Sequence, residues 1–132
     1  MPCRKVDAAP SFALPRDAVG NSPTLDPILM ERWPEITIER AVYSEHDPQN
    51  LLCFADNFYD LVYSHQVLKH VPKPWMAAKE MVRILKGGGI GIHTSCAFNP
   101  RHGVPKFNDY YRFLPDGLAE LFDGVRIVVK EG

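Results

Sequence analysis

The residues of this sequence best suited to chemistry gather where one apolar run ends. Ser64, His65 and Gln66 directly follow the apolar residues 61–63, and His70 lies four positions further on. Hydroxyl, imidazole and amide groups hold polar ligands, and an imidazole is suited to general base catalysis near neutral pH. The two histidines are five residues apart, which is not the spacing of a two-histidine metal motif on a helix. We therefore expect a ligand site here and no metal.

A second group of polar and aromatic residues follows the next apolar run. It lies in a connection that is long for a compact domain, and such connections are often functional. Aromatic faces with a few polar groups are typical of a small-molecule pocket, in which Asp109 or Tyr110 could serve as a base. The alternative is a surface loop in which Arg112 pairs with Asp109 or Asp116. The members of this group are Asn99, His102, Asp109, Tyr110, Tyr111 and Arg112.

The hydrophobic pattern shows which elements position these residues. Residues 61–63 have the composition of a strand, and apolar residues recur at spacings of three and four over 75–85, after two prolines suited to a helix entry. The glycines at 87–89 are predicted to stop this helix, and residues 90–94 again resemble a strand. Because the glycines follow a helix and precede a strand, a phosphate-binding loop is disfavoured. The order strand, helix, strand predicts a parallel crossover unit of an α/β sheet.

The flanking segments predict further elements. Residues 1–23 lack sustained periodicity and are expected to form an irregular lead-in. A short helix is predicted over 26–33, between an Asp-Pro start and Pro34, and a strand over 36–43. A helix over 115–122 and a final strand over 125–130 complete the chain. We expect one domain over residues 1–132, with its core in 36–132.

Composition limits the classes of partner. Fifteen basic and sixteen acidic residues give a net charge of −1, which predicts no nucleic acid partner and no anionic membrane partner. No apolar run approaches the roughly 20 residues that span a bilayer. Three distant cysteines without a Cys-x-x-Cys motif disfavour disulfides and zinc, so a cytoplasmic location is expected.

Four segments resemble the class I S-adenosylmethionine-dependent methyltransferases, in particular the type 11 group. They are residues 54–64 (FADNFYDLVYS), 64–71 (SHQVLKHV), 80–89 (EMVRILKGGG) and 111–122 (YRFLPDGLAELF). In order, they resemble the approach to the family's fourth strand, the turn after it, the junction before the fifth strand, and the segment before the sixth. The resemblance spans residues 47–122.

This resemblance implies a Rossmann-like methyltransferase sheet of mainly parallel strands, with helices on both faces, in a shortened form. Lys69 stands where the family usually has glutamate, and Gly87 where it usually has proline. The family's glycine-rich donor loop has no counterpart in residues 1–46, where Gly20 is the only glycine. The chain is also expected to lack the family's last strand.

The resemblance implies S-adenosylmethionine as the methyl donor and a small molecule as the acceptor. Its implied base is His70, His65 or Tyr110, although His70 could equally be a packing residue. Asp47 would accept a hydrogen bond from the adenine amino group, or else be a solvated loop residue, and Ser64 could instead cap a turn. The implied donor-binding residues are Asp47, Gln49, Asn50, Ser64, His65 and Gln66.

Three interpretations of function follow. The first is a methyltransferase that transfers a methyl group from S-adenosylmethionine to a small-molecule acceptor. The second is a non-catalytic, methyltransferase-like module that binds a partner or ligand, which the missing glycine loop favours. The third is a homodimer in which another chain completes the sheet, because a half sheet leaves an open edge strand.

Overall fold

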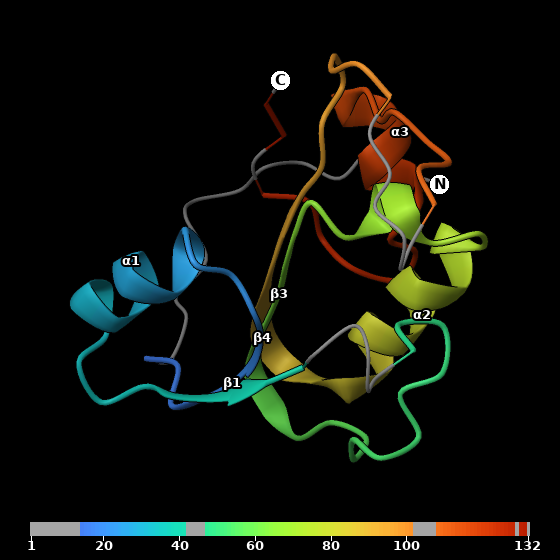
Figure 1. The fold of residues 1–132 in the computed structure, drawn as a ribbon. Helices are drawn as coiled ribbons and strands as arrows, with labels where there is room; N and C mark the ends of the chain where they lie inside the picture. Colours follow the sequence, from blue (N-terminus) through green and yellow to red (C-terminus); the bar gives the residue numbers. More distant parts are fainter. Residues whose placement is uncertain (1–13, 42–46, 102–107, 129, 132) are drawn as a thin grey trace.

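The computed structural model describes residues 14–41, 47–101, 108–128 and 130–131. These residues form a four-stranded parallel sheet in the order β2-β1-β3-β4. Figure 1 shows α1 on one side of the sheet and α2 and α3 on the other. The predicted α/β, Rossmann-like arrangement is therefore confirmed. In chain order, the elements are β1 (Asp17–Gly20), α1 (Leu25–Arg32), β2 (Thr37–Arg40), β3 (Tyr59–His65), the 3-10 helix η1 (Leu68–His70), α2 (Pro74–Ile84), β4 (Leu85–Thr94) and α3 (Pro115–Glu120).

Each face of the sheet has its own apolar core, because alternate side chains of a strand point to opposite faces. On the α1 face, Ala18 and Leu61 pack with Leu29 of the helix. On the α2 face, Val19 and Val62 pack with a larger cluster from the helix and the loop before β3. Burial on both faces explains why β3 is apolar over most of its length.

The strand β1 corrects the prediction of an irregular lead-in over residues 1–23. Residues 17–20 lie inside the sheet, paired with both β2 and β3, while residues 1–13 lie outside the described part of the chain. The carboxylate of Asp60 on β3 accepts the backbone N–H groups of Arg16 (3.1 Å) and Asp17 (3.0 Å). These bonds, that of Asp17 first, lower the pKa of Asp60. A long-range contact that no local pattern reveals thus holds the start of β1.

The glycine run corrects a second prediction. Helix α2 ends at Ile84, before the glycines, and residues 87–89 belong to β4. Tyr59 pairs with Leu85, but Leu61 pairs with Ile90, so five steps along β4 oppose two steps along β3. The extra residues form a bulge, and Gly88 has the positive φ of 81° that a glycine adopts without strain.

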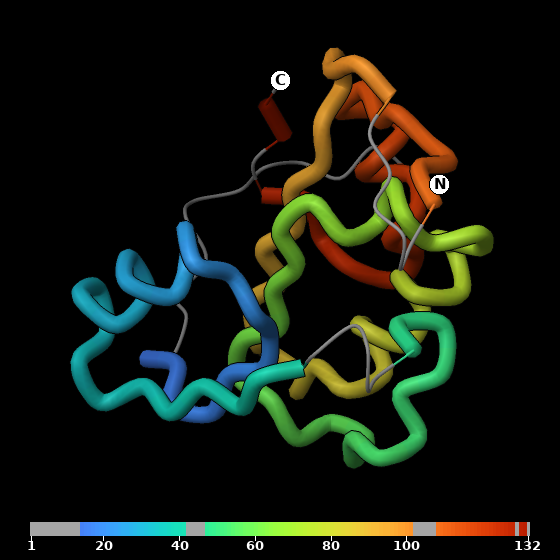
Figure 2. The backbone as a smooth tube through the Cα atoms, viewed as in Figure 1, coloured from blue at the N-terminus to red at the C-terminus, as the bar shows by residue number. Residues whose placement is uncertain are grey.

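The end of the chain agrees with prediction only in part. The helix expected over 115–122 is present as α3, but described residues 125–128 and 130 form no strand, so the predicted final strand is wrong. Figure 2 shows the segment after α3 turning back toward the strands. Its apolar side chains border a cavity beside β4 instead of joining a ladder. Among the described residues, no helix combines the length and apolar character needed to cross a bilayer.

Candidate functional site

The connections of the sheet mark where a ligand site belongs. From β1 the chain crosses through α1 to β2 at one edge, whereas from β3 it crosses through α2 to β4 at the other. β1 and β3 are therefore neighbours whose connections diverge, and open α/β sheets bind ligands beyond the carboxyl ends of such strands. Gly20 ends β1 there and Asn21 follows it, and Ser64 and His65 end β3.

A cavity of about 70 Å³ lies at this switch point. Pockets for drug-sized ligands measure roughly 300–1,000 Å³, so this cavity holds only a few atoms. The described residues thus form an apolar floor with polar groups at its rim. The lining residues come from β1, β3, α2, the loop before β3 and the turns after β1 and β3: Val19, Gly20, Asn21, Ala41, Pro48, Leu51, Phe54, Val62, Tyr63, Ser64, Val67, Met81 and Ile84.

The ring of Tyr63 covers the end of β1. A Cβ atom at Gly20 would lie 2.5 Å from the nearest ring carbon, so only glycine leaves room for the ring. The Tyr63 hydroxyl donates to the buried carboxylate of Asp26, and burial, followed by this hydrogen bond, raises the pKa of the phenol. Sequence reasoning identified neither residue as part of the site, because their contact depends on the strand register.

The turn between β1 and α1 is stabilised by its own side chains. The carboxylate of Asp26 accepts the backbone N–H of Ser22 at 3.0 Å, and the Ser22 hydroxyl accepts that of Leu25 at 3.0 Å. A nitrogen of Arg40 lies 3.4 Å from the same carboxylate. The backbone N–H groups of Ser22 and Leu25, in the turn that follows β1, therefore already have hydrogen-bond partners.

We expect Gly20→Ala to lower the free energy of unfolding by about 2 kcal/mol, because overpacking a buried contact costs 1–3 kcal/mol. Urea unfolding of the two proteins measures this loss. Gly117→Ala is the matched control, since nothing lies within 4 Å of a Cβ at that position in α3. Equal midpoints for Gly20→Ala and the unmodified chain would show that the ring of Tyr63 does not fill this space.

Two polar pairs connect the ends of β3 and β4. Ser64 Oγ lies 2.9 Å from Nδ1 of His93, and His65 Nδ1 lies 2.6 Å from Oγ1 of Thr94. Each pair joins direct neighbours across the ladder. The ring of His93 stacks on Phe122 at 4.3 Å between centroids, and burial lowers the pKa of His93 to about 3. His93 is therefore neutral near pH 7 and packs against Phe122.

The three predicted donor-binding residues of the preceding loop form a turn. Asp47 is exposed, and its carboxylate accepts the backbone N–H of Gln49 at 2.9 Å. The side chain of Gln49 accepts the backbone N–H of Lys73, at the start of α2, at 3.1 Å. Asn50 is exposed, and only Pro48 of this turn lines the cavity. Their role in donor binding stays a prediction.

Gln66 and Lys69 form a polar contact beneath the turn after β3. Gln66 has a positive φ of 59°, and its amide oxygen accepts a hydrogen bond from the Lys69 ammonium group at 3.1 Å. Lys69 is only 3% exposed, and its Nζ also lies 3.5 Å from Sγ of Cys96. The departure from the family's glutamate therefore places a buried ammonium group beside the end of β4.

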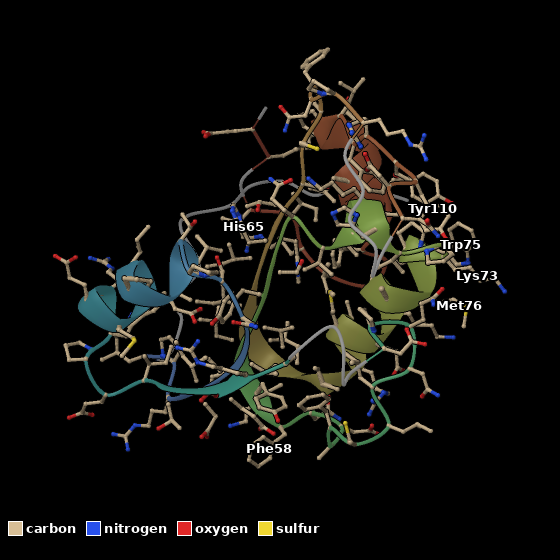
Figure 3. All side chains as sticks on the ribbon, viewed as in Figure 1. Phe58, His65, Lys73, Trp75, Met76 and Tyr110 are labelled. Atoms are coloured by element: carbon tan, nitrogen blue, oxygen red, sulfur yellow. The ribbon has the colours of Figure 1, made fainter. Side chains whose placement is uncertain are left out.

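The two other predicted bases lie apart from these pairs. His70 is buried, and its Nδ1 donates to the backbone oxygen of Asn108 at 2.7 Å. Tyr110 is 47% exposed, and its hydroxyl accepts the amide N–H of Asn108 at 3.1 Å. Figure 3 places His65 and Tyr110 on opposite sides of the upper part of the fold. The structure thus groups Ser64, His65 and Gln66, but not Tyr110.

An ion pair occupies the predicted acceptor loop. Arg112 contacts both carboxylate oxygens of Asp109, at 2.6 and 2.7 Å, and the Asp109 side chain is 1% exposed. Asp116 instead pairs with Lys130 at 2.5 Å. Arg112 therefore pairs with Asp109 and not with Asp116, through a carboxylate that is buried. The role of this loop in binding an acceptor stays a prediction.

Comparison with known proteins identifies the family. A family model described as "Methyltransferase domain" matches residues 25–92. The chain belongs to this family. It is also 42% identical over 97 residues to an "Uncharacterized methyltransferase" of Mycobacterium avium (strain 104), a match that covers 52% of this chain and 38% of the relative. A protein of the same description from Mycobacterium marinum (strain ATCC BAA-535 / M) is 42% identical over 83 residues, covering 45% and 32%. This methyltransferase-family chain thus spans only about a third of these relatives' length.

A solved structure shares the fold of this methyltransferase-family chain. The crystal structure titled "[4+2]-Cyclase SpnF" superimposes with a TM-score of 0.53 at 18% identity, covering 83% of this chain and 49% of that one. Such a likeness shows the fold alone. Because one fold carries several chemistries, the reaction must be argued from the site.

Proposed function

We propose that this chain forms part of an S-adenosylmethionine-dependent methyltransferase that acts on a small-molecule acceptor. The observation that carries the proposal is the pair of polar contacts, Ser64 with His93 and His65 with Thr94, beside the β1–β3 switch point. Membership of the methyltransferase family supports it. The donor and the class of acceptor are expectations from the family resemblance.

The residues at this edge fit the donor as a shallow support. Val19, Val62 and Leu51 offer an apolar floor for an adenine ring, and Ser64 a hydroxyl at its rim. The hydroxyl of Ser95, directly after β4, is buried without a hydrogen-bond partner among the described residues. A buried hydroxyl of this kind is stabilised when a polar ligand reaches it. Because the cavity is small, the donor would lie across its rim.

The proposed chemistry needs little from the protein beyond positioning. S-adenosylmethionine supplies a methyl group already activated by a sulfonium centre, so holding the acceptor in line contributes most of the rate enhancement. His65 is the residue we assign as base. Thr94 fixes its ring through Nδ1, and its Nε2 has no partner within the described ranges. His65 is also partly exposed, so an acceptor hydroxyl or amine can reach that nitrogen.

Calorimetric titration with S-adenosylmethionine and with its demethylated product tests the proposal. We expect micromolar dissociation constants, about tenfold weaker in Asp47→Asn, because the amide no longer offers a charged acceptor to the adenine amino group. Glu31→Gln, an exposed change on α1, is the control and should bind like the unmodified chain. The absence of heat with millimolar ligand would exclude a donor site in this chain alone.

The second candidate is a non-catalytic, methyltransferase-like binding module. The packing of Tyr63 over Gly20 and the 70 Å³ cavity favour it, because both leave little room at the end of β1. Donor binding that is absent from this chain but present in a longer protein containing it would favour the first candidate. Absence of donor binding from both proteins would favour the second candidate.

A further inference from the structure

The turn after β3 and the end of β4 bring together an amine and a thiol. Nζ of Lys69, in η1, lies 3.5 Å from Sγ of Cys96, which follows β4 by two residues. Lys69 is 3% exposed and Cys96 is 9% exposed, so both side chains lie inside the fold. Amines and thiols are the nucleophiles of covalent chemistry in proteins, and the proposed methyl transfer uses neither of these two.

The side chain of Gln66 holds the amine beside the sulfur. Its amide oxygen accepts a hydrogen bond from Nζ of Lys69 at 3.1 Å. Within the described ranges, Nζ contacts this oxygen and the sulfur of Cys96 but no carboxylate. Buried ammonium groups are almost always paired with an anion. A buried lysine beside a thiol therefore indicates a role other than ion pairing.

Backbone hydrogen bonds fix both ends of this contact. The carbonyl oxygen of Lys69 accepts the N–H groups of Tyr110 (2.9 Å) and Tyr111 (3.2 Å), and that of Cys96 accepts the N–H of Phe113 at 3.1 Å. The described chain itself therefore holds the amine and the thiol together. Their separation of 3.5 Å lies at the upper end of the distances, about 3–3.5 Å, from which positioned groups react.

We infer that Lys69 and Cys96 form a covalent sulfur–nitrogen crosslink when the chain is exposed to hydrogen peroxide. The thiol first takes one oxygen from peroxide and becomes a sulfenic acid, while the other oxygen leaves as water. The Lys69 nitrogen then attacks the sulfur, so that the S–N bond forms and the S–O bond breaks. The hydroxyl group leaves as water with one proton of the ammonium group, and a second proton passes to solvent. Peroxide accepts the two electrons, and the remaining N–H can still donate to Gln66.

The position of Cys96 favours this crosslink over a disulfide. A sulfenic acid condenses with the thiol or nitrogen that lies within its reach. Both described cysteines are free, but Cys53 is exposed whereas Cys96 is buried, so the nucleophile beside the Cys96 sulfur is Lys69. The crosslink joins the turn after β3 to the end of β4, beside the proposed donor site, and does not depend on the function of that site.

Peroxide treatment followed by tryptic peptide mapping tests the inference. A chain carrying Cys3→Ser and Cys53→Ser keeps Cys96 as its only thiol, which excludes disulfides within the chain. We expect the peptides that contain Lys69 and Cys96 to appear as one linked species, lighter than their sum by two hydrogen atoms. Trypsin should no longer cut after Lys69. Dithiothreitol should restore both separate peptides, because thiols reduce a sulfur–nitrogen bond of this kind.

Lys69→Met in the same chain removes the amine but keeps an apolar stem, so its Cys96 peptide should gain oxygen instead of a link. Lys79→Met, at an exposed position of α2, is the matched control and should crosslink fully. With Lys69 intact, a Cys96 peptide that only gains oxygen, or that does not react, would overturn the inference. A link to another residue, or one that retains oxygen between nitrogen and sulfur, would do the same. These outcomes are decisive even if Lys69→Met does not fold.

Discussion

Acid should destabilise this chain at pH values where its carboxylates are still ionised, and His93 should be the main cause. Burial lowers the pKa of His93 to about 3 from an ordinary value of 6.5. Between these values the unfolded chain binds a proton that the folded chain does not. The free energy of unfolding therefore falls as the pH falls through 6.5, and this loss is complete below about 3. At 1.36 kcal/mol per pKa unit, we expect a loss of about 2 kcal/mol by pH 5.

Urea unfolding of the unmodified chain and of His93→Phe at pH 7, 6 and 5 measures this effect. His93→Phe should lose much less stability over that range, because phenylalanine does not titrate. Asp60 and Glu80 also have lowered pKa values, caused first by the Asp17 N–H and by Arg83, respectively. Lowered carboxylate pKa values reduce stability only as the pH falls below the ordinary values near 4, so they contribute little above pH 5. Parallel losses in the two proteins would contradict the role of His93.

The central crossover could be predicted because its signals are local. The prolines at the entry to α2, the helical spacing of its buried residues and the apolar run of β3 each act within a few positions. β1 could not be predicted in this way, because it has only four residues and its start is held by Asp60, 43 positions away. The prediction of a final strand over 125–130 was wrong because composition does not reveal whether a segment finds a neighbouring strand with which to pair.

The candidate site shows the same difference between local signals, which the sequence reveals, and long-range contacts, which it does not. Ser64, His65 and Gln66 could be found because they end a recognisable strand, and the structure keeps them together at that point. Their partners on β4 depend on register, which the bulge at 87–89 shifts. The contact of Tyr63 with Gly20 also depends on register, since it joins neighbouring strands. A sequence signal for it would require the pairing of β1 with β3, which short strands do not specify.

Arg83→Met should lower the free energy of unfolding by about 3 kcal/mol, because hydrogen bonds to a charged group contribute about 1.5–3 kcal/mol each in favourable settings. The guanidinium group donates to the backbone oxygens of Leu51 (2.8 Å) and Phe54 (3.1 Å), and to both carboxylate oxygens of Glu80 at 3.0 Å. It also pairs with Asp56. Methionine preserves the apolar stem and the helix propensity of α2, so the loss should report on the charged head.

Lys79→Met on the same helix is the matched control, because Lys79 is exposed and its loss should change stability by less than about 0.5 kcal/mol. Arg83→Lys should restore little, since one ammonium group cannot span two carbonyl groups and a carboxylate. The carboxylate of Glu80 accepts the backbone N–H of Leu51 at 2.7 Å, so the network fixes both polar groups of that residue. Leu51 and Phe54 line the small cavity, so Arg83→Met should also weaken any ligand bound there. An unchanged urea midpoint in Arg83→Met would mean that burial of Leu51 and Phe54 alone holds this loop on α2.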